Sequence, residues 1–267
     1  MNNGANHSNK HSSDEQQPES GHSPPQVNLG TSMPLAAEME SVQEVSAQEG
    51  YALWAASYDE ENNPLIAVEE LHIDKLLASL TFTKALDVGT GTGRYALKLA
   101  RGGARVTAID SSSEMLTVAR RAAQSEGLSI DFRLAALEPG LPFESNQFDL
   151  LVCALTLCHV PDLAAAVQEF ARVLRAGGYL LITDFHPASV SYGWRTQFKR
   201  AGVKYLLPNM PHIRNDYLAA LSMSGLTLLE VMDIPHRELP PGYFTEEFMR
   251  IHGDKMLCLL LLAQKKT

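Results

Sequence analysis

The chain has 267 residues, 45% of them hydrophobic, which is typical of one large α/β domain with a substantial core. Its formal charge of −9 and pI near 5.5 argue against a nucleic-acid surface, because neutralising phosphates needs clustered lysines and arginines. The longest apolar run, 256–263, falls short of the ~20 residues that span a bilayer, and the N-terminus has no apolar signal segment, so we expect a cytoplasmic protein that binds no membrane. The oligomeric state stays open.

Residues 1–39 read as a polar tail. They are rich in Asn, Ser, His, Gln and Pro and carry few large apolar side chains. Such a segment cannot bury enough surface to offset the entropy lost on ordering. We therefore predict a disordered tail over 1–39 and a folded domain over 40–267.

The domain begins with aromatic residues at helical spacing. Tyr51, Trp54 and Tyr58 fall at i, i+3 and i+7, which places them on one face of a helix. We expect this face to pack against a sheet.

Strands and helices then alternate. The pattern predicts helices at 65–80, 95–101, 111–125, 163–174 and 216–224, with strands at 84–88, 105–109, 130–134, 148–154, 179–183, 226–231 and 256–264. Alternation of this kind, with nearly all-apolar strands, indicates a doubly wound parallel sheet covered by helices on both faces.

The three cysteines show no zinc-binding or redox spacing. Cys153 and Cys158 lie in an apolar segment, where we expect them to pack as small hydrophobic side chains. The sequence offers no metal site.

A glycine-rich turn follows the predicted strand 84–88, in the run Gly89-Thr90-Gly91-Thr92-Gly93. Such a turn lets the backbone approach a ligand closely, and Asp110 at the tip of the next strand can accept hydrogen bonds from a ribose diol. Arg94 stands where a dinucleotide-binding motif needs its third glycine, and the carboxylate of Asp87 would repel a pyrophosphate. These features favour a nucleoside site that differs from that of NAD(P) enzymes.

Four motifs together resemble the class I S-adenosylmethionine-dependent methyltransferases. They are the glycine turn with Asp87, the strand ending at Asp110 followed by 114–116, the segments 141–143 and 148–152, and the run 172–184. The resemblance is close over about 51–184. It implies an α/β, Rossmann-like, doubly wound seven-stranded sheet that is mostly parallel with an antiparallel last strand. It also implies S-adenosylmethionine as cofactor.

The resemblance further implies which residues contact this cofactor. The glycine turn and Asp87 would face the methionine part, Asp110 the ribose and Met115 the adenine. The expected set is Asp87, Gly89, Thr90, Gly91, Gly93, Arg94, Asp110, Ser111, Met115, Ala136, Leu137 and Ala154. The family commonly has an acidic residue where Ala136 stands, so main-chain groups near Ala136 and Leu137, or the side chain of Glu138, would hold the adenine instead.

Candidate catalytic bases are His159, His186 and Tyr58, with His212 less favoured. The two leading histidines follow the fourth and fifth strands, at the sheet edge where ligands bind. In proteins that this chain resembles, the N-terminal helix often acts as a lid, which assigns that part to 40–63.

The segment 187–215 is an insertion after the fifth strand. It holds Arg195, Lys199, Arg200, Lys204 and Arg214 and has no Asp or Glu. One interpretation is a solvated helix face over 194–205. The other is a cationic cap over the substrate site that draws in an anionic acceptor.

The expected activity is methyl transfer from S-adenosylmethionine to oxygen or nitrogen, with carbon less favoured, of a small metabolite that could be anionic. Two alternatives stay open. One is a Rossmann-type NAD(P)-dependent oxidoreductase, and the other is a non-catalytic S-adenosylmethionine-binding regulatory domain.

Overall fold

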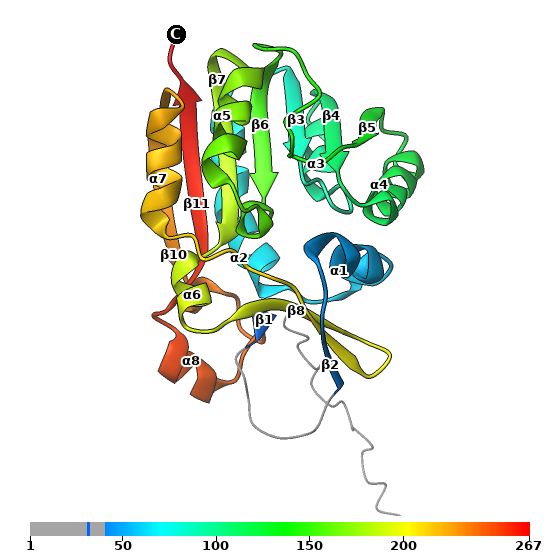
Figure 1. The fold of residues 1–267 in the computed structure, drawn as a ribbon, viewed down its shortest axis with the longest axis vertical. Coiled ribbons are helices and arrows are strands. Elements are labelled where there is room, and N and C mark those ends of the chain that lie inside the picture. The colour runs from blue at the N-terminus through cyan, green and yellow to red at the C-terminus, as the bar shows by residue number, and fades with distance from the viewer. Residues whose placement is uncertain (1–30, 33–40) are drawn as a thin grey trace, which may run out of the picture.

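A seven-stranded sheet forms the centre of the computed structural model, which describes residues 31–32 and 41–267 (Figure 1). Its order is β10-β11-β7-β6-β3-β4-β5. The strands are β3 (Lys84–Val88), β4 (Arg105–Asp110), β5 (Ile130–Leu134), β6 (Phe148–Ala154), β7 (Leu174–Phe185), β10 (Leu226–Pro235) and β11 (Met256–Lys265). The last strand, β11, runs antiparallel to both of its neighbours, β10 and β7, and the other four strand pairs are parallel, so the predicted fold class is confirmed.

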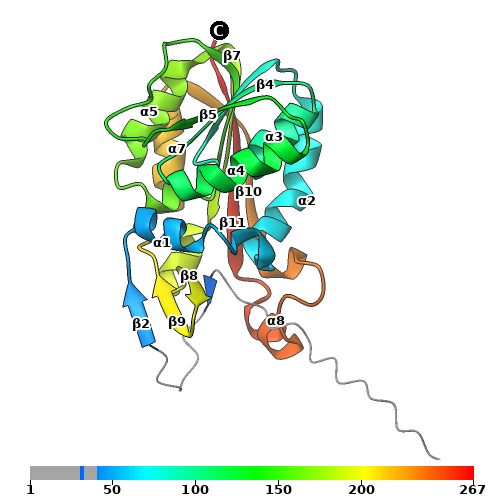
Figure 2. The same ribbon diagram turned by 90° about the vertical axis from the view of Figure 1, so that its right-hand side faces the viewer.

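Helices cover both faces of the sheet. Figure 2 shows α5 (Leu163–Val173) and α7 (Arg214–Met223) on one side, and α2 (Pro64–Ser79), α3 (Arg94–Arg101) and α4 (Ser113–Ser125) on the other. Two hydrophobic cores result, one under α5 and α7 and one under α2 and α3. Central strands are therefore buried on both faces, which is why β6 is apolar at nearly every position.

Side-chain caps fix where the helices begin. Asn63 accepts a hydrogen bond from the Leu65 N–H at 2.9 Å ahead of α2, and Ser112 accepts one from the Met115 N–H at 3.2 Å ahead of α4. The observed helices start within two residues of the predicted positions. Two strand boundaries differ more. The strand β7 begins at Leu174, directly after α5, five residues earlier than predicted, and β10 extends to Pro235, four residues beyond its predicted end.

A second, smaller sheet lies beyond the carboxyl ends of the large one (Figures 1 and 2). Its order is β1-β8-β9-β2, formed by β1 (Thr31–Ser32), β8 (Arg195–Arg200), β9 (Val203–Leu206) and β2 (Ser41–Glu44). The interpretation of 194–205 as a helix is therefore wrong. Ala201 and Gly202 have φ values of 50° and 77°, the conformation of a two-residue hairpin turn that reverses the chain.

The aromatic residues of the N-terminal segment pack on this hairpin and not on the large sheet. Tyr51 and Trp54 belong to α1 (Ala47–Trp54), and Tyr58 begins the 3-10 turn η1 (Tyr58–Glu60). Nearly parallel rings run from Tyr51 to Trp54, Phe198 and Tyr205, with centroid separations of 6.0, 4.8 and 4.9 Å. The helical spacing of the first two was predicted correctly, but the surface that they cover was not.

The predicted tail lies almost wholly outside the described residues. Thr31 and Ser32 are the exception, because they pair with Thr196 and Arg195 of β8, so the prediction of disorder is wrong at these two positions. All three cysteines are buried and free, as expected for Cys153 and Cys158.

Four further short elements were not predicted from the sequence. They are η2 (Leu157–His159), α6 (Pro187–Ser191), η3 (His236–Glu238) and α8 (Glu246–His252).

Candidate functional site

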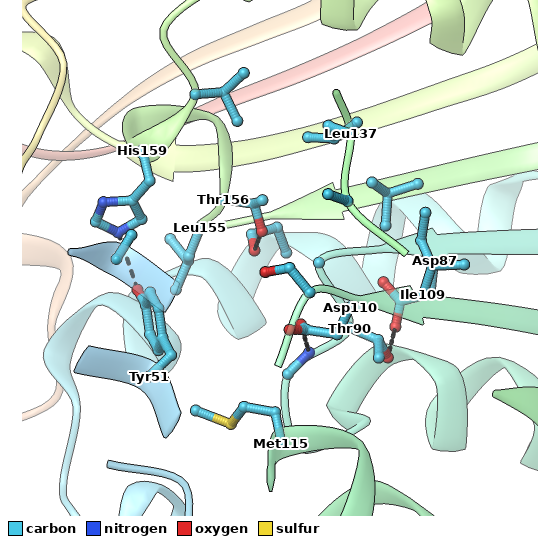
Figure 3. A pocket seen from close by; sticks show the side chains of 18 of the residues that line it. Tyr51, Asp87, Thr90, Ile109, Asp110, Met115, Leu137, Leu155, Thr156 and His159 are labelled. Atoms are coloured by element: carbon cyan, nitrogen blue, oxygen red, sulfur yellow. Dashed lines mark hydrogen bonds between the residues drawn. The ribbon is translucent and has the colours of Figure 1, made fainter. Parts of the chain in front are cut away.

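A cavity of about 330 Å³ lies at the carboxyl ends of β3, β4 and β6, and α1 and η1 form its outer wall (Figure 3). The strand order reverses between β3 and β6, the point where open α/β sheets bind ligands. Most of the predicted residues line the cavity, namely Tyr58, Asp87, Gly89, Thr90, Gly91, Arg94, Asp110, Ser111, Met115, Ala136, Leu137, Ala154 and His159.

Asp110 is held by backbone donors at the cavity wall. Its Oδ2 accepts a hydrogen bond from the Gly91 N–H and its Oδ1 one from the Ser112 N–H, both at 2.8 Å. Burial raises the pKa of Asp110, while the backbone N–H groups oppose that shift. Each carboxylate oxygen keeps lone pairs for a further donor, as a ribose diol would provide. Because Ser112 caps α4, Asp110 is not the helix cap.

Asp87 ties the glycine turn to the following helix. Its Oδ2 accepts from the Thr90 hydroxyl at 2.6 Å and from the Ala96 N–H at 2.9 Å. Burial raises the pKa of Asp87 to about 6, so the carboxylate is largely ionised at neutral pH. It can therefore receive a cation in the cavity, such as an ammonium group. At Gly91, where φ is 56°, the space that a Cβ would enter is open.

Gly89 shows how tightly the turn is packed. Its φ is 69°, and an added Cβ would lie 2.6 Å from Cγ2 of Thr156. A side chain at positive φ costs about 1–2 kcal/mol, and overpacking adds about 1–3 kcal/mol. Gly89→Ala should therefore lower the free energy of unfolding, measured in urea, by more than Gly103→Ala. Gly103 is the matched control, since its φ is 87° but no atom lies within 4 Å of an added Cβ. Equal losses in the two variants would contradict the packing argument.

His159 and Tyr51 form a hydrogen-bonded pair on the opposite wall (Figure 3). His159 Nδ1 lies 2.7 Å from the carbonyl oxygen of Pro208. A carbonyl can only accept, so Nδ1 carries the proton and Nε2 is the acceptor. The Tyr51 hydroxyl, 3.0 Å away, therefore donates to Nε2. Burial lowers the pKa of His159, although the bond to Pro208 raises it, so the ring is neutral at physiological pH.

Tyr58 and Arg94 also face the cavity. Burial raises the pKa of Tyr58 well above its ordinary value, so its hydroxyl stays protonated and is a poor base. Arg94 pairs with the fully buried Glu69, whose other oxygen accepts from the Thr183 hydroxyl. Burial alone would lower the pKa of Arg94, but Glu69 raises it. The cation is thus fixed at the wall, where it can meet a carboxylate.

Three predicted or candidate residues lie elsewhere. His186 is buried, accepts from the Ala188 N–H at Nδ1 and contacts Asp233 through Nε2 at 3.0 Å, so both nitrogens are used outside the cavity. His212 bonds to the Val160 carbonyl at 2.8 Å. Gly93 begins α3, and a Cβ there would lie 3.0 Å from that of Ala119, so this glycine serves the packing of α3 on α4. Neither a base role for His186 nor a ligand contact for Gly93 fits these positions.

The basic insertion does not form a cationic cap over the cavity. In the described structure, none of its five cations is among the lining residues. Arg214 pairs with Asp233 at 2.8 Å, and Arg195 lies 3.7 Å from Glu44. Arg200 donates to the Leu53 carbonyl at 2.6 Å. Carboxylates from other parts of the chain thus pair with two of these five cations, Arg214 and Arg195.

Sequence reasoning missed part of the lining. The missed residues include Gln48, Tyr51, Leu155, Thr156, Val160 and Pro161. Leu155 has a φ of 53°, a costly conformation for leucine that often marks functional sites. Its only sequence signal was its place after a predicted strand. Tyr51 carried a signal, the helical aromatic spacing, which was interpreted as core packing and as part of a lid over 40–63, but Tyr51 itself was not predicted as a site residue.

Within the described ranges, no three His, Cys, Asp or Glu side chains gather in a way that could hold a metal ion. A search of the same residues for a helix long and apolar enough to cross a membrane found none.

The chain is similar to known methyltransferases. A family model described as a methyltransferase domain matches residues 86–182. A ubiquinone biosynthesis O-methyltransferase from Xylella fastidiosa (strain M23) is 34% identical over 179 residues, covering 63% of this chain and 71% of that protein.

Solved structures share the fold. An S-adenosylmethionine-dependent methyltransferase from Clostridium acetobutylicum ATCC 824 superposes with a TM-score of 0.59 at 15% identity, covering 80% of this chain and 97% of that one. Geranyl diphosphate C-methyltransferase from Streptomyces coelicolor A3(2), solved with S-adenosyl-L-homocysteine, gives a TM-score of 0.56 at 17% identity over 74% and 79% of the two chains.

Proposed function

Because this chain belongs to the class I S-adenosylmethionine-dependent methyltransferases, we propose that it methylates a hydroxyl group of a small, uncharged aromatic molecule, with His159 as the final proton acceptor. The observation that carries the proposal is the fixed tautomer of His159, which leaves a basic nitrogen at the cavity wall. The O-methyltransferase relative supports oxygen as the acceptor atom.

S-adenosylmethionine is the methyl donor, and the residues present fit it. The carboxylate of Asp110, anchored by two backbone N–H groups, would hold the ribose hydroxyls. Arg94 would meet the methionine carboxylate, and Asp87 its ammonium group. Open space at Gly91 would admit the ligand close to the backbone. When bound, the donor supplies a methyl group that its sulfonium has already activated.

We call the wall with Asp87, Gly91 and Asp110 the donor side of the cavity and the opposite wall the acceptor side. The two sides differ chemically. Tyr51, Tyr58 and His159 present aromatic rings on the acceptor side, and Leu155 and Val160 add apolar surface. Flat aromatic molecules match such a wall, because rings pack favourably on rings. His159 is neutral and none of the insertion's cations lines the cavity. The one lining arginine, Arg94, is assigned to the donor's carboxylate in this proposal, so no cation is left for the acceptor. The anionic acceptor considered from the sequence is therefore not part of the proposal.

The protein contributes alignment and proton removal. Holding the acceptor in line with the methyl group is worth up to about 7–11 kcal/mol. Removal of the hydroxyl proton by a positioned base adds about 10²–10⁴-fold. His159 suits that task because burial keeps it unprotonated and the Pro208 carbonyl fixes its orientation.

A panel of acceptors tests the proposal. The full-length protein would be incubated with methyl-labelled S-adenosylmethionine and with catechol, phenol, benzyl alcohol, aniline or benzoate, and the products identified by mass spectrometry. We expect methyl ethers from the phenols and no methylated aniline or benzoate. Transfer to nitrogen alone would overturn the choice of oxygen.

Two controls address the other functions considered from the sequence. Calorimetry with S-adenosylmethionine, NAD and NADP should show binding of the first alone, as Arg94 and Asp87 predict. Repeated turnover of the labelled methyl group would exclude a purely regulatory binding domain, whereas tight donor binding without transfer to a broad metabolite extract would support one.

A further inference from the structure

The pair of Tyr51 and His159 places a constraint on proton transfer, and the inference drawn from it rests on the proposed function. A neutral imidazole has one lone pair available for hydrogen bonding, on its unprotonated nitrogen. In His159 that nitrogen is Nε2, because Nδ1 donates to the Pro208 carbonyl. The Tyr51 hydroxyl already donates to Nε2 at 3.0 Å. An acceptor molecule in the cavity therefore cannot bond to Nε2 while this contact persists.

The Tyr51 oxygen, by contrast, keeps two lone pairs after its own proton is directed at His159. It lines the same cavity as the glycine turn and Asp110, on the opposite wall (Figure 3). We propose that Tyr51 is the catalytic residue that contacts the acceptor hydroxyl and passes its proton to His159. Tyr51 thus acts as a relay, and His159 stores the proton.

The step balances without any further reactant. The acceptor oxygen gives its proton to the Tyr51 oxygen as its bond to the methyl carbon forms and the carbon–sulfur bond breaks. In the same concerted step Tyr51 gives its original proton to Nε2 of His159, and the imidazolium that forms later releases a proton to solvent. Tyr51 begins and ends as a phenol, which agrees with its buried environment, since burial raises the pKa of Tyr51 well above its ordinary value.

The ring stack explains how Tyr51 is held in place. Its ring lies parallel to that of Trp54, which in turn stacks on Phe198 of the hairpin. Trp54 Nε1–H donates to Glu61 at 2.9 Å, which fixes the middle ring. His159 is fixed independently through Pro208, beyond the same hairpin. Both partners are thus oriented before any acceptor enters.

A double-mutant cycle tests the relay. Tyr51→Phe, His159→Gln and the double variant would be assayed with the best phenol of the acceptor panel at saturating donor. A relay predicts that each single variant lowers kcat by at least ~100-fold and that the double variant is no slower than the slower single one. Tyr205→Phe removes a hydroxyl from the far end of the same ring stack and is the matched control, with wild-type kcat expected.

The pH dependence of kcat distinguishes a proton relay through Tyr51 from a purely structural role of this residue. The wild-type rate should fall as the pH drops through the lowered pKa of His159, and Tyr51→Phe should lose this acid limb along with His159→Gln. If Tyr51→Phe keeps the wild-type kcat and acid limb, the acceptor reaches His159 directly and the relay is wrong. Additive losses in the cycle would also overturn it. Absence of any methyl ether from the wild-type protein would instead refute the proposed function.

A spectroscopic measurement on the donor-free protein completes the test. Nitrogen-15 NMR of histidine-labelled protein should show His159 protonated at Nδ1, with an Nε2 resonance that moves toward that of free imidazole in Tyr51→Phe. A protonated Nε2 in the wild-type protein would rule out the relay, because Tyr51 could not then donate to it.

Discussion

Replacing His159 by glutamine is expected to lower kcat for phenol methylation by about 10²–10⁴-fold, the usual contribution of a positioned base. Glutamine fills similar space and can still hydrogen-bond to Tyr51, but its amide does not take up a proton near neutral pH. Donor affinity should change little, because the proposed nucleoside site is at Asp110 and the glycine turn, on the opposite wall of the cavity. Steady-state kinetics and calorimetry together would measure both effects.

The pH dependence of the activity should also differ between the wild type and the His159→Gln variant. Burial lowers the pKa of His159 below its ordinary 6.5, and only the neutral ring can accept a proton. Wild-type activity should therefore be at its plateau at neutral pH and decline only in acid, while the glutamine variant should show no such decline. His212→Gln is the matched control, since the His212 ring is not among the lining residues and reaches the cavity wall only through its hydrogen bond to the Val160 carbonyl. A His159→Gln protein with normal kcat would remove the base from the proposed function.

Asp110→Ala should weaken S-adenosylmethionine binding roughly 10- to 150-fold, because hydrogen bonds to a charged group contribute about 1.5–3 kcal/mol. The alanine variant also frees the N–H groups of Gly91 and Ser112, which the carboxylate holds at 2.8 Å. Calorimetric titration of the folded variant is the measurement. We expect the Asp110→Ala variant to fold and to bind S-adenosylmethionine more weakly than the wild type.

A neighbouring carboxylate provides the control for that experiment. Asp131 on β5 pairs with Arg133 on the exposed surface, away from the cavity lining. Asp131→Ala should leave donor affinity unchanged. Should Asp110→Ala bind the donor as tightly as wild type, its assignment to the ribose would have to be abandoned.

That Asp87, the turn glycines Gly89 and Gly91, and Asp110 would line one cavity could be predicted because their signals are local. Asp87, the glycines of the turn and Asp110 each stand at the end of a strand whose apolar run is plain in the sequence. Parallel strands bring their carboxyl ends to one edge, so recognising the strands also places these residues. Gly93 was predicted as a cofactor contact but lies where α3 packs on α4. A glycine pattern alone does not distinguish a close approach to a ligand from close packing of two helices.

The acceptor side depends on contacts between distant parts of the chain. Nothing near His159 in the sequence reveals that the Pro208 carbonyl fixes its tautomer or that Tyr51 occupies its other nitrogen. The base role considered for His186 failed in the same way, since Asp233 and the Ala188 N–H engage its ring. A histidine at the right sheet edge is a candidate, and only the fold shows where its nitrogens point.

The hairpin was missed because its turn is short. The segment from Trp194 to Tyr205 was interpreted as one solvated helix face, but Ala201 and Gly202 reverse the chain within two residues. Alanine rarely adopts positive φ, so this pair is a weak turn signal compared with Asn-Gly. The positive charge of 187–215 likewise depends on contacts outside the segment, because Arg214 pairs with Asp233 and Arg195 lies near Glu44.

The ring stack from Tyr51 to Tyr205 has a consequence for divergence. It joins the segment that precedes the large sheet to a hairpin inserted far later in the chain. A substitution that reshapes the hairpin shifts the ring on which Trp54 lies, and Tyr51 with it, whereas the strand ends that face the donor are untouched. During natural selection for a new methyl acceptor, substitutions in the N-terminal segment and in the hairpin would then be expected to arise together. Laboratory libraries that randomise 51–58 and 196–206 together should yield altered acceptor preference more often than libraries confined to either segment.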